Sequence, residues 1–97
     1  MASRRHREPT TPGELLLEAF LKPLQITQVQ LAKHLDCDVK LINRIVNGRT
    51  RITANVALRL AAALQTTPDF WLNAQNAVDV YRARQTTELP PPIKAQA

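Results

Sequence analysis

The chain has 97 residues, 44% of them hydrophobic, and its 13 Lys and Arg outnumber its 8 Asp and Glu to give a formal net charge of +5. This length suits one domain with a small core, and the lack of any apolar run near ~20 residues excludes a membrane-spanning helix. The two glycines and few aromatic residues argue against a β-rich architecture. One cysteine, and a basic start with no apolar stretch after it, predict a cytoplasmic protein without an internal disulfide.

The N-terminal residues 1–10 carry the basic cluster Arg4-Arg5-His6-Arg7 and no helical pattern. We expect a disordered basic tail here; the alternative is an arm that contacts phosphates. A helix is predicted after Thr11, because a threonine cap followed by a proline and a glutamate at the first and third helical positions is a strong start signal. Pro23 is expected to end this helix.

Two short helices are predicted next, over residues 27–35 and 39–47. Thr27 and Gln30 form a capping box at the start of the first, Asp38 is suited to cap the second, and Gly48 is suited to end it. A helix pair with so tight a connection is the layout of a helix-turn-helix, whose second helix enters the major groove of DNA. The pair therefore predicts sequence-specific DNA binding.

The helix over residues 39–47 has two distinct sides. At about 100° per residue, apolar residues gather on one side and polar residues on the other. The apolar set is Val39, Ile42, Ile45 and Val46; the polar set is Lys40, Asn43, Arg44 and Asn47, with Leu41 on the flank. Lys and Arg can donate to guanine edges or phosphates, and Asn can pair with adenine. The polar side is a candidate for reading bases, and a merely solvated helix face is the alternative.

The positive charge is concentrated around this helix. Residues 33–59 hold six Lys or Arg against two Asp. An excess of positive charge on one element is the electrostatic signature of a protein that binds a polyanion. Two alternatives remain open, a basic surface that only confers solubility and an acidic protein partner.

A fourth helix is predicted from the Thr53 cap through Leu64, and a fifth from Thr67 to about Arg84. Apolar side chains cover an arc of roughly 120° on the fifth helix. A face broader than one contact needs is a candidate dimer surface, for which we select Phe70, Trp71, Val78 and Tyr81. The alternative is that its aromatic residues all belong to the core. Residues 85–97 form an extended Pro-rich tail, which is either disordered or docks on a neighbour.

An enzymatic or metal-binding function has little support. His34, Asp36, Cys37 and Asp38 are possible ligands, but no second His or Cys pair exists to complete a zinc site. There is no glycine-rich phosphate loop and no distinctive pair of carboxylates. We therefore expect no catalytic residues, no metal and no cofactor.

Several sequence segments resemble those of the HigA family of helix-turn-helix antitoxins, also called VapI-type, which belongs to the Cro/C1 superfamily. They are Pro12-Gly13-Glu14, Thr27-Gln28 through Leu31-Ala32, Ile42 through Gly48, Ala57 through Ala61, and Thr67 through Gln75. The resemblance covers roughly residues 9 to 84. It implies an all-α, five-helix, lambda-repressor-like domain over residues 11–84, which binds DNA and dimerises. It also implies neutralisation of an mRNA-cleaving toxin of the HigB type and repression of the protein's own operon.

The same resemblance implies roles for individual residues. The first turns of the third helix would read bases, through Val39, Lys40, Leu41 and Arg44. We add Asn43, which lies on the polar side of the same helix. Phosphate contacts would fall to Gln28, Asn47, Arg49 and Arg51. Asp36 stands where a glycine is common, and Val39 and Leu41 stand where polar base readers are common. The rival interpretation is a stand-alone helix-turn-helix repressor without a toxin partner.

Overall fold

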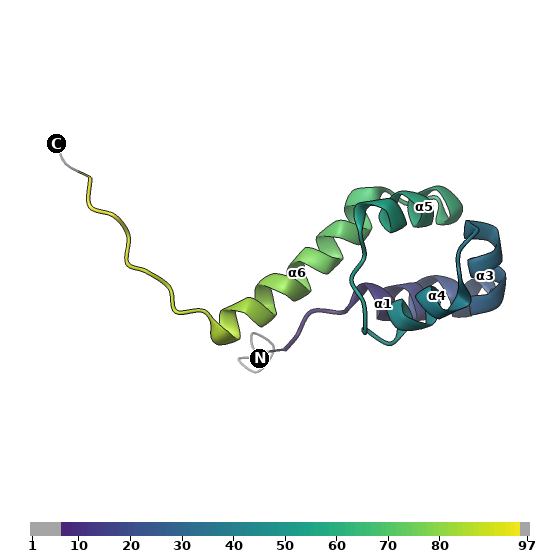
Figure 1. Cartoon of the computed structure of the whole chain (residues 1–97), viewed down its shortest axis with the longest axis horizontal. Coiled ribbons are helices and arrows are strands. Elements are labelled where there is room, and N and C mark those ends of the chain that lie inside the picture. The colour runs from purple at the N-terminus through teal and green to yellow at the C-terminus, as the bar shows by residue number, and fades with distance from the viewer. Residues whose placement is uncertain (1–6, 96–97) are drawn as a thin grey trace.

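The computed structural model describes residues 7–95, and this part of the chain contains helices and no strands (Figure 1). The first helical stretch is made of α1 (Pro12–Leu15), a π-helical segment η2 (Leu16–Leu21) and α2 (Lys22–Leu24). It is followed by α3 (Gln28–Leu35), α4 (Val39–Val46), α5 (Ala54–Leu64) and α6 (Pro68–Thr86). The predicted all-α, five-helix architecture is therefore confirmed.

Each predicted helix start is capped as the sequence indicates. Thr11 accepts a hydrogen bond from the Glu14 N–H at 3.1 Å, and the Glu14 carboxylate accepts one from the Thr11 N–H, which makes a complete capping box. Thr27 and Gln30 form the second box at α3. The remaining caps lie at Asp38, Thr53 and Thr67. These local bonds satisfy N–H groups that have no partner within the helix.

The prediction that Pro23 ends the first helix is wrong, because Pro23 lies within α2 and the helix ends one residue later. In the π-helical segment before it, hydrogen bonds reach back five residues, as from the Lys22 N–H to the Leu17 carbonyl. A proline in a regular α-helix clashes with the carbonyl four residues earlier. Here Pro23 is the second residue of α2, which directly follows the π-helical segment. Gln25, at φ 57°, then terminates the stretch.

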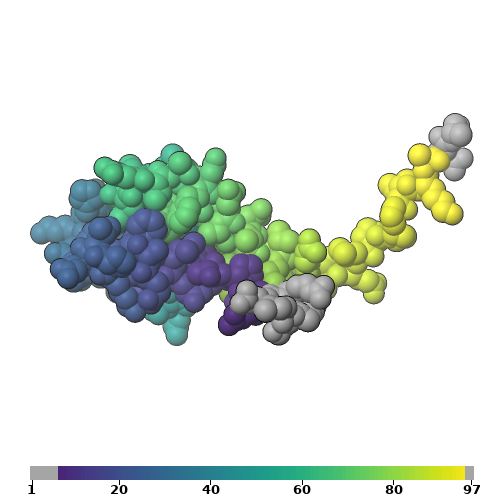
Figure 2. Space-filling model, turned by 180° about the vertical axis from the view of Figure 1, so that it is seen from behind, coloured from purple at the N-terminus to yellow at the C-terminus, as the bar shows by residue number. Residues whose placement is uncertain are grey.

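One buried cluster joins all of the helical stretches. Its members are Leu16, Leu21, Leu31, Ala32, Leu35, Ile42, Ile45, Ile52, Ala57, Leu60, Ala61 and Trp71. The last turns of α6, after Val78, extend beyond this core, and residues 87–95 continue away from it as an extended segment (Figures 1 and 2). The helices in the described part of the chain include none that is both long and apolar enough to cross a membrane.

The predicted boundaries of the terminal tails agree only in part with the structure. Residues 1–6 of the predicted N-terminal tail lie outside the described residues. Residues 8–10 have no regular secondary structure, but Glu8 forms an ion pair with Arg82 of α6. At the other end, α6 continues to Thr86, two residues past the predicted boundary.

Candidate nucleic-acid interface

The orientation of α4 follows from its two sides. Ile42 and Ile45 are buried in the core, which turns Lys40, Asn43, Arg44 and Asn47 to the exposed side. The predicted inner position of Val39 is wrong, since its side chain is 38% exposed. Val39 is the first residue of α4, where the helix has only begun to pack on the core. The polar residues selected from the sequence thus share one exposed face.

A glycine fixes how closely the first helix approaches α4. Gly13 is buried, and a Cβ atom built on it would lie 1.9 Å from the carbonyl oxygen of Ile45. No side chain fits at that distance, so the backbones of α1 and α4 contact each other directly. The C-terminal end of α4 is therefore in direct backbone contact with α1.

The polar side of α4 is linked to the start of α3. The Asn43 amide donates to Oε1 of Gln28 at 3.3 Å, and the Asn47 amide donates to Oδ1 of Asn43 at 3.2 Å. A shallow hollow of about 420 Å³ beside them is lined by Gln28, Val39, Lys40, Asn43, Arg44 and Arg49. The structure thus brings together most residues selected for DNA contact, from two helices and the loop after α4. Leu41 lies on the flank, partly buried against the core.

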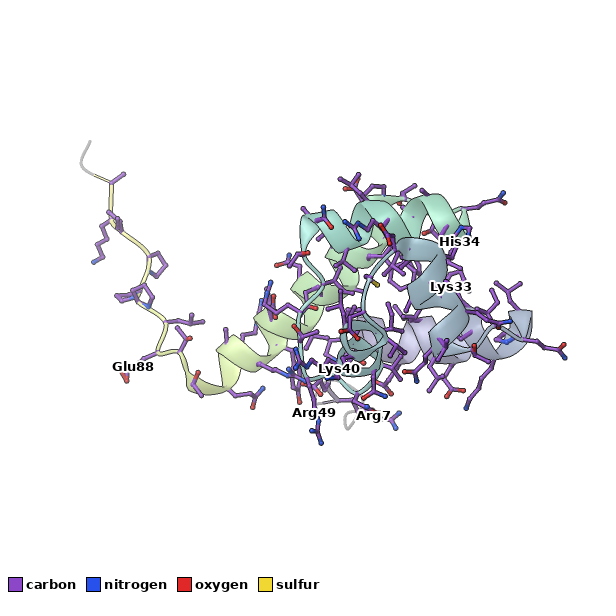
Figure 3. All side chains as sticks on the ribbon, turned by 45° about the vertical axis from the view of Figure 1, so that its right-hand side comes forward. Arg7, Lys33, His34, Lys40, Arg49 and Glu88 are labelled. Carbon is purple, nitrogen blue, oxygen red and sulfur yellow. The ribbon has the colours of Figure 1, made fainter. Side chains whose placement is uncertain are left out.

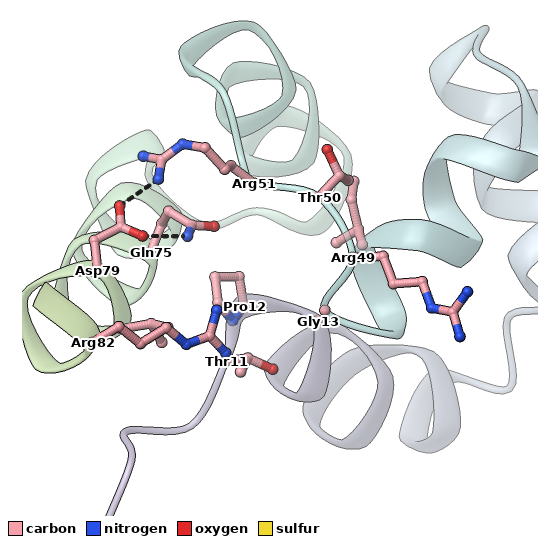
Figure 4. A pocket seen from close by; sticks show the side chains of 12 residues that line it. Thr11, Pro12, Gly13, Arg49, Thr50, Arg51, Gln75, Asp79 and Arg82 are labelled. Carbon is pink, nitrogen blue, oxygen red and sulfur yellow. Dashed lines mark hydrogen bonds and ion pairs between the residues drawn. The ribbon is translucent and has the colours of Figure 1, made fainter. Parts of the chain in front are cut away.

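The side chains of Arg49 and Arg51, in the loop after α4, point in different directions (Figure 4). Gly48, at φ 69°, turns the chain out of α4, and Arg49 then lines the hollow beside Arg44. Arg51 points instead toward α6, where its Nη1 lies 2.6 Å from Oδ2 of Asp79. The two predicted phosphate ligands therefore have different surroundings, because Arg51 already has an anionic partner.

Gln75 and Asp79 were not selected from the sequence, and both hold this loop to α6. Gln75 is buried; its Oε1 accepts a hydrogen bond from the Ile52 N–H at 2.9 Å, and its Nε2 donates to Asp79 at 3.1 Å. Partial burial raises the pKa of Asp79, but hydrogen bonds from Arg51 and Gln75 outweigh it and leave the pKa below its usual value. No local motif marks this network, because the contacts between the loop and α6 join residues at least 23 positions apart in the sequence. Only the Gln75–Asp79 bond lies within one helix.

The predicted dimer face needs a correction. Trp71 is 0% and Val78 is 2% exposed, so both belong to the core of a single chain and neither is available to a second copy. Trp71 donates to Oγ1 of Thr66 at 2.7 Å, and its ring centroid lies 5.4 Å from that of Phe20. The first helical stretch thus covers the part of α6 that the sequence pattern left unpartnered. Phe70, 39% exposed, and the half-buried Tyr81 remain nearer the surface.

The possible metal ligands around the turn between α3 and α4 are not assembled into a site. Within residues 7–95 no group of three or more His, Cys, Asp and Glu could hold a metal ion. Arg59 donates from Nη1 to the Leu35 carbonyl at 3.1 Å and so covers the end of α3. Burial raises the pKa of the Cys37 thiol. Asp36 takes the left-handed conformation, at φ 57°.

The fold and this exposed basic helix define a helix-turn-helix protein. A helix-turn-helix family model matches residues 17–71, and the chain belongs to that family. The resemblance to HigA-type antitoxins is also confirmed. Antitoxin HigA-1 of Vibrio cholerae is 44% identical over 78 residues, which cover 80% of this chain and 73% of the relative.

Two solved structures support the same assignment. An addiction module antidote protein of the HigA family from Coxiella burnetii is 43% identical with a TM-score of 0.76, covering 81% of this chain and 86% of that one. The Pseudomonas aeruginosa antitoxin HigA, solved with the higBA promoter, is 30% identical with a TM-score of 0.79, covering 88% of this chain and 99% of that one. These neighbours share the fold together with substantial sequence identity.

Proposed function

We propose that this protein is a sequence-specific DNA-binding antitoxin that represses its own operon and neutralises an mRNA-cleaving toxin of the HigB type. The exposed polar face of α4, held between α1 and the Gln28 end of α3, is the observation that carries the DNA-binding part. The relative from Pseudomonas aeruginosa, solved with promoter DNA, supports the same function. The antitoxin part rests on the similarity to HigA proteins.

In the proposed complex α4 lies in the major groove. Lys40, Asn43 and Arg44 read base edges, and Val39 and the flanking Leu41 offer apolar contact to thymine methyl groups. Gln28, Asn47 and Arg49 contact phosphates. Arg51 acts chiefly by holding the loop against α6, because Asp79 already neutralises its charge. Phosphate contacts supply most of the affinity, and base contacts supply the preference.

We further propose that the protein binds as a homodimer, with two α4 helices in successive major grooves about 34 Å apart. The support is the exposed surface of α6: Phe70 and half-buried Tyr81, eleven positions apart, lie on one side of the helix, and the 42% exposed Val80 lies about 80° around the helix from Phe70. A two-fold symmetric protein requires a two-fold symmetric operator.

A gel-shift titration on the DNA upstream of the protein's own gene, against random competitor, tests the DNA-binding part. We expect competitor-resistant binding to a symmetric site; binding no tighter than to random DNA would contradict the proposal. Coexpression with the neighbouring gene tests the antitoxin part. Copurification of a small toxic protein is expected, whereas tight operator binding with no such partner would favour the stand-alone repressor.

A further inference from the structure

Three amide side chains form a row of hydrogen bonds across the exposed face of α4. The Asn47 amide donates to Oδ1 of Asn43 at 3.2 Å, and the Asn43 amide donates in turn to Oε1 of Gln28 at 3.3 Å. Asn43 lies within α4 and Asn47 caps its end, whereas Gln28 is the first residue of α3. This amide network of Gln28, Asn43 and Asn47 therefore joins the two helices of the pair.

The position of Gln28 is set by the start of α3. The preceding residue, Thr27, accepts a hydrogen bond from the Gln30 N–H at 3.0 Å, and Oε1 of Gln30 accepts one from the Thr27 N–H at 2.8 Å. Gln28 is half-buried, and Asn43 is exposed. Because its partners lie on α3 and at the end of α4, the Asn43 amide is restricted in the directions in which it can point.

The amide network leaves part of the bonding capacity of Asn43 unused. A primary amide has two N–H donors, and its oxygen has two acceptor lone pairs. Toward its described neighbours, Asn43 uses one donor with Gln28 and one lone pair with Asn47. One donor and one acceptor remain. An adenine requires this combination, because its major-groove edge presents an N7 acceptor and an N6 donor.

The surroundings of Asn43 also suit the thymine of the same base pair. Val39 is 38% exposed, and it lines the hollow of about 420 Å³ beside Asn43. Thymine presents its C5 methyl group in the major groove, where an apolar side chain can contact it. Figure 3 shows Lys40 and Arg49, which line the same hollow, along one edge of the molecule. The hollow thus combines an amide, an apolar side chain and positive charge.

We propose that Gln28 and Asn47 determine base preference through Asn43: they orient its amide to read the adenine of an A·T pair, whose thymine methyl group lies against Val39. This inference rests on the proposed DNA binding and gives two residues assigned to phosphates a second role. Gln28 fills both roles at once, because its Oε1 accepts from Asn43 while its Nε2 donates to a phosphate. Asn43 touches the base, and Gln28 and Asn47 are positioning residues.

Base preference is measured by selection from a pool of random duplexes, followed by titration of the selected site and of all its single-base substitutions. Asn43→Ala, Gln28→Ala and Asn47→Ala each remove one member of the amide network. Gln28→Glu keeps an oxygen acceptor for Asn43 but adds a negative charge. Two controls lie outside the network: Arg49→Ala removes a proposed phosphate ligand, and Gln85→Ala removes an exposed amide near the end of α6.

We expect the wild-type protein to prefer A·T at one position of each half-site by about 10- to 100-fold. Asn43→Ala should abolish this preference, and Gln28→Ala and Asn47→Ala should reduce it at the same position. Gln28→Glu should keep the preference but bind every duplex more weakly, because its charge repels phosphates. Arg49→Ala should weaken binding to all duplexes alike, and Gln85→Ala should behave as the wild type.

Phosphate contact alone predicts a different result for the positioning residues. Gln28→Ala and Asn47→Ala proteins that lose affinity equally for every duplex, with the wild-type preference intact, would overturn the proposal. An A·T preference that persists in Asn43→Ala would overturn it too, while leaving sequence-specific binding established. A wild-type protein that selects no sequence from the pool would instead contradict the proposed function, and this inference with it.

Discussion

Gly13 and Ile45 lie in direct backbone contact, such that a methyl group on residue 13 would be 1.9 Å from the Ile45 carbonyl oxygen. The atom it would meet belongs to the backbone of α4 and cannot rotate away. The position of the proposed recognition helix therefore depends on the absence of a side chain at residue 13.

Gly13→Ala is expected to force α1 and α4 apart, with a loss of about 1–3 kcal/mol in the free energy of unfolding and a larger loss in operator affinity. Thermal denaturation followed by circular dichroism and gel shifts measure the two effects. Gly48→Ala is the matched control: it meets nothing within 4 Å but has φ +69°, so it should cost about 1–2 kcal/mol in strain alone. A Gly13→Ala protein with wild-type stability and affinity would contradict the close contact.

Arg44 and Arg49 line the same hollow yet are expected to contribute differently to DNA binding. Arg44→Ala should cost about 1–3 kcal/mol on the operator and little on random DNA, because it removes a base contact. Arg49→Ala should weaken both duplexes alike and reduce the salt slope by about 1 per protomer. Titrations of both variants on both duplexes measure this. Equal losses for the two variants on each duplex would refute the division of roles.

Gln75→Leu should destabilise the fold by about 1–3 kcal/mol, because it leaves the Ile52 N–H without its acceptor in the interior. Denaturant titration measures the change. Asn76→Leu, at an exposed neighbouring position of α6, is the control for the altered side-chain size and polarity. We expect Gln75→Leu also to loosen the loop after α4, which faster amide hydrogen exchange at Arg51 and Ile52 would reveal. A variant as stable as the control would count against the network.

The lowered pKa of Asp79 predicts that the free energy of unfolding depends on pH in the acidic range. A carboxyl whose pKa is lower in the folded state stabilises the fold fully above its unfolded pKa, and this contribution is lost as pH falls through the folded pKa. The wild-type protein should thus lose stability below about pH 4. Asp79→Asn should lose less over the same range, as measured by denaturant titrations from about pH 7 to about pH 3. Parallel curves for the two proteins would argue against an ionised, paired Asp79.

Val80 offers a test of the proposed dimer surface that avoids the core. Val80→Glu places a charge on the exposed side of α6 and should shift the protein toward monomer in analytical ultracentrifugation. Val29→Glu, at a 62% exposed valine of α3, is the matched control and should leave the dimer intact. A Val80→Glu protein that sediments as the wild type would exclude this part of α6 from the interface.

The sequence predicts helix starts well, because each cap is a local bond between residues two or three positions apart. The two sides of α4 could also be inferred, since burial of Ile42 and Ile45 follows directly from helical periodicity. Periodicity identifies an apolar side, however, and does not say what covers it. For this reason the pattern suggests a dimer surface at Trp71 and Val78, although the chain's own core encloses them.

Other features depend on contacts between distant residues. The Gln75–Ile52 bond and the Arg51–Asp79 pair join α6 to a loop more than twenty residues away in the sequence. Neither the residue types nor their spacing predicts these contacts. The π-helical segment likewise has no signature of its own, so the position of Pro23 within the helix could not be predicted.

Trp71 is the one tryptophan of the chain, and its indole is enclosed against Phe20 and Phe70 with its N–H bonded to Thr66. Phe20 belongs to η2, whereas Phe70 and Trp71 belong to α6, so the surroundings of the indole depend on whether η2 is packed against α6. Its fluorescence emission is therefore an intrinsic optical probe of folding, moving to longer wavelength when water reaches the ring. The protein needs no attached dye for its unfolding to be followed in real time.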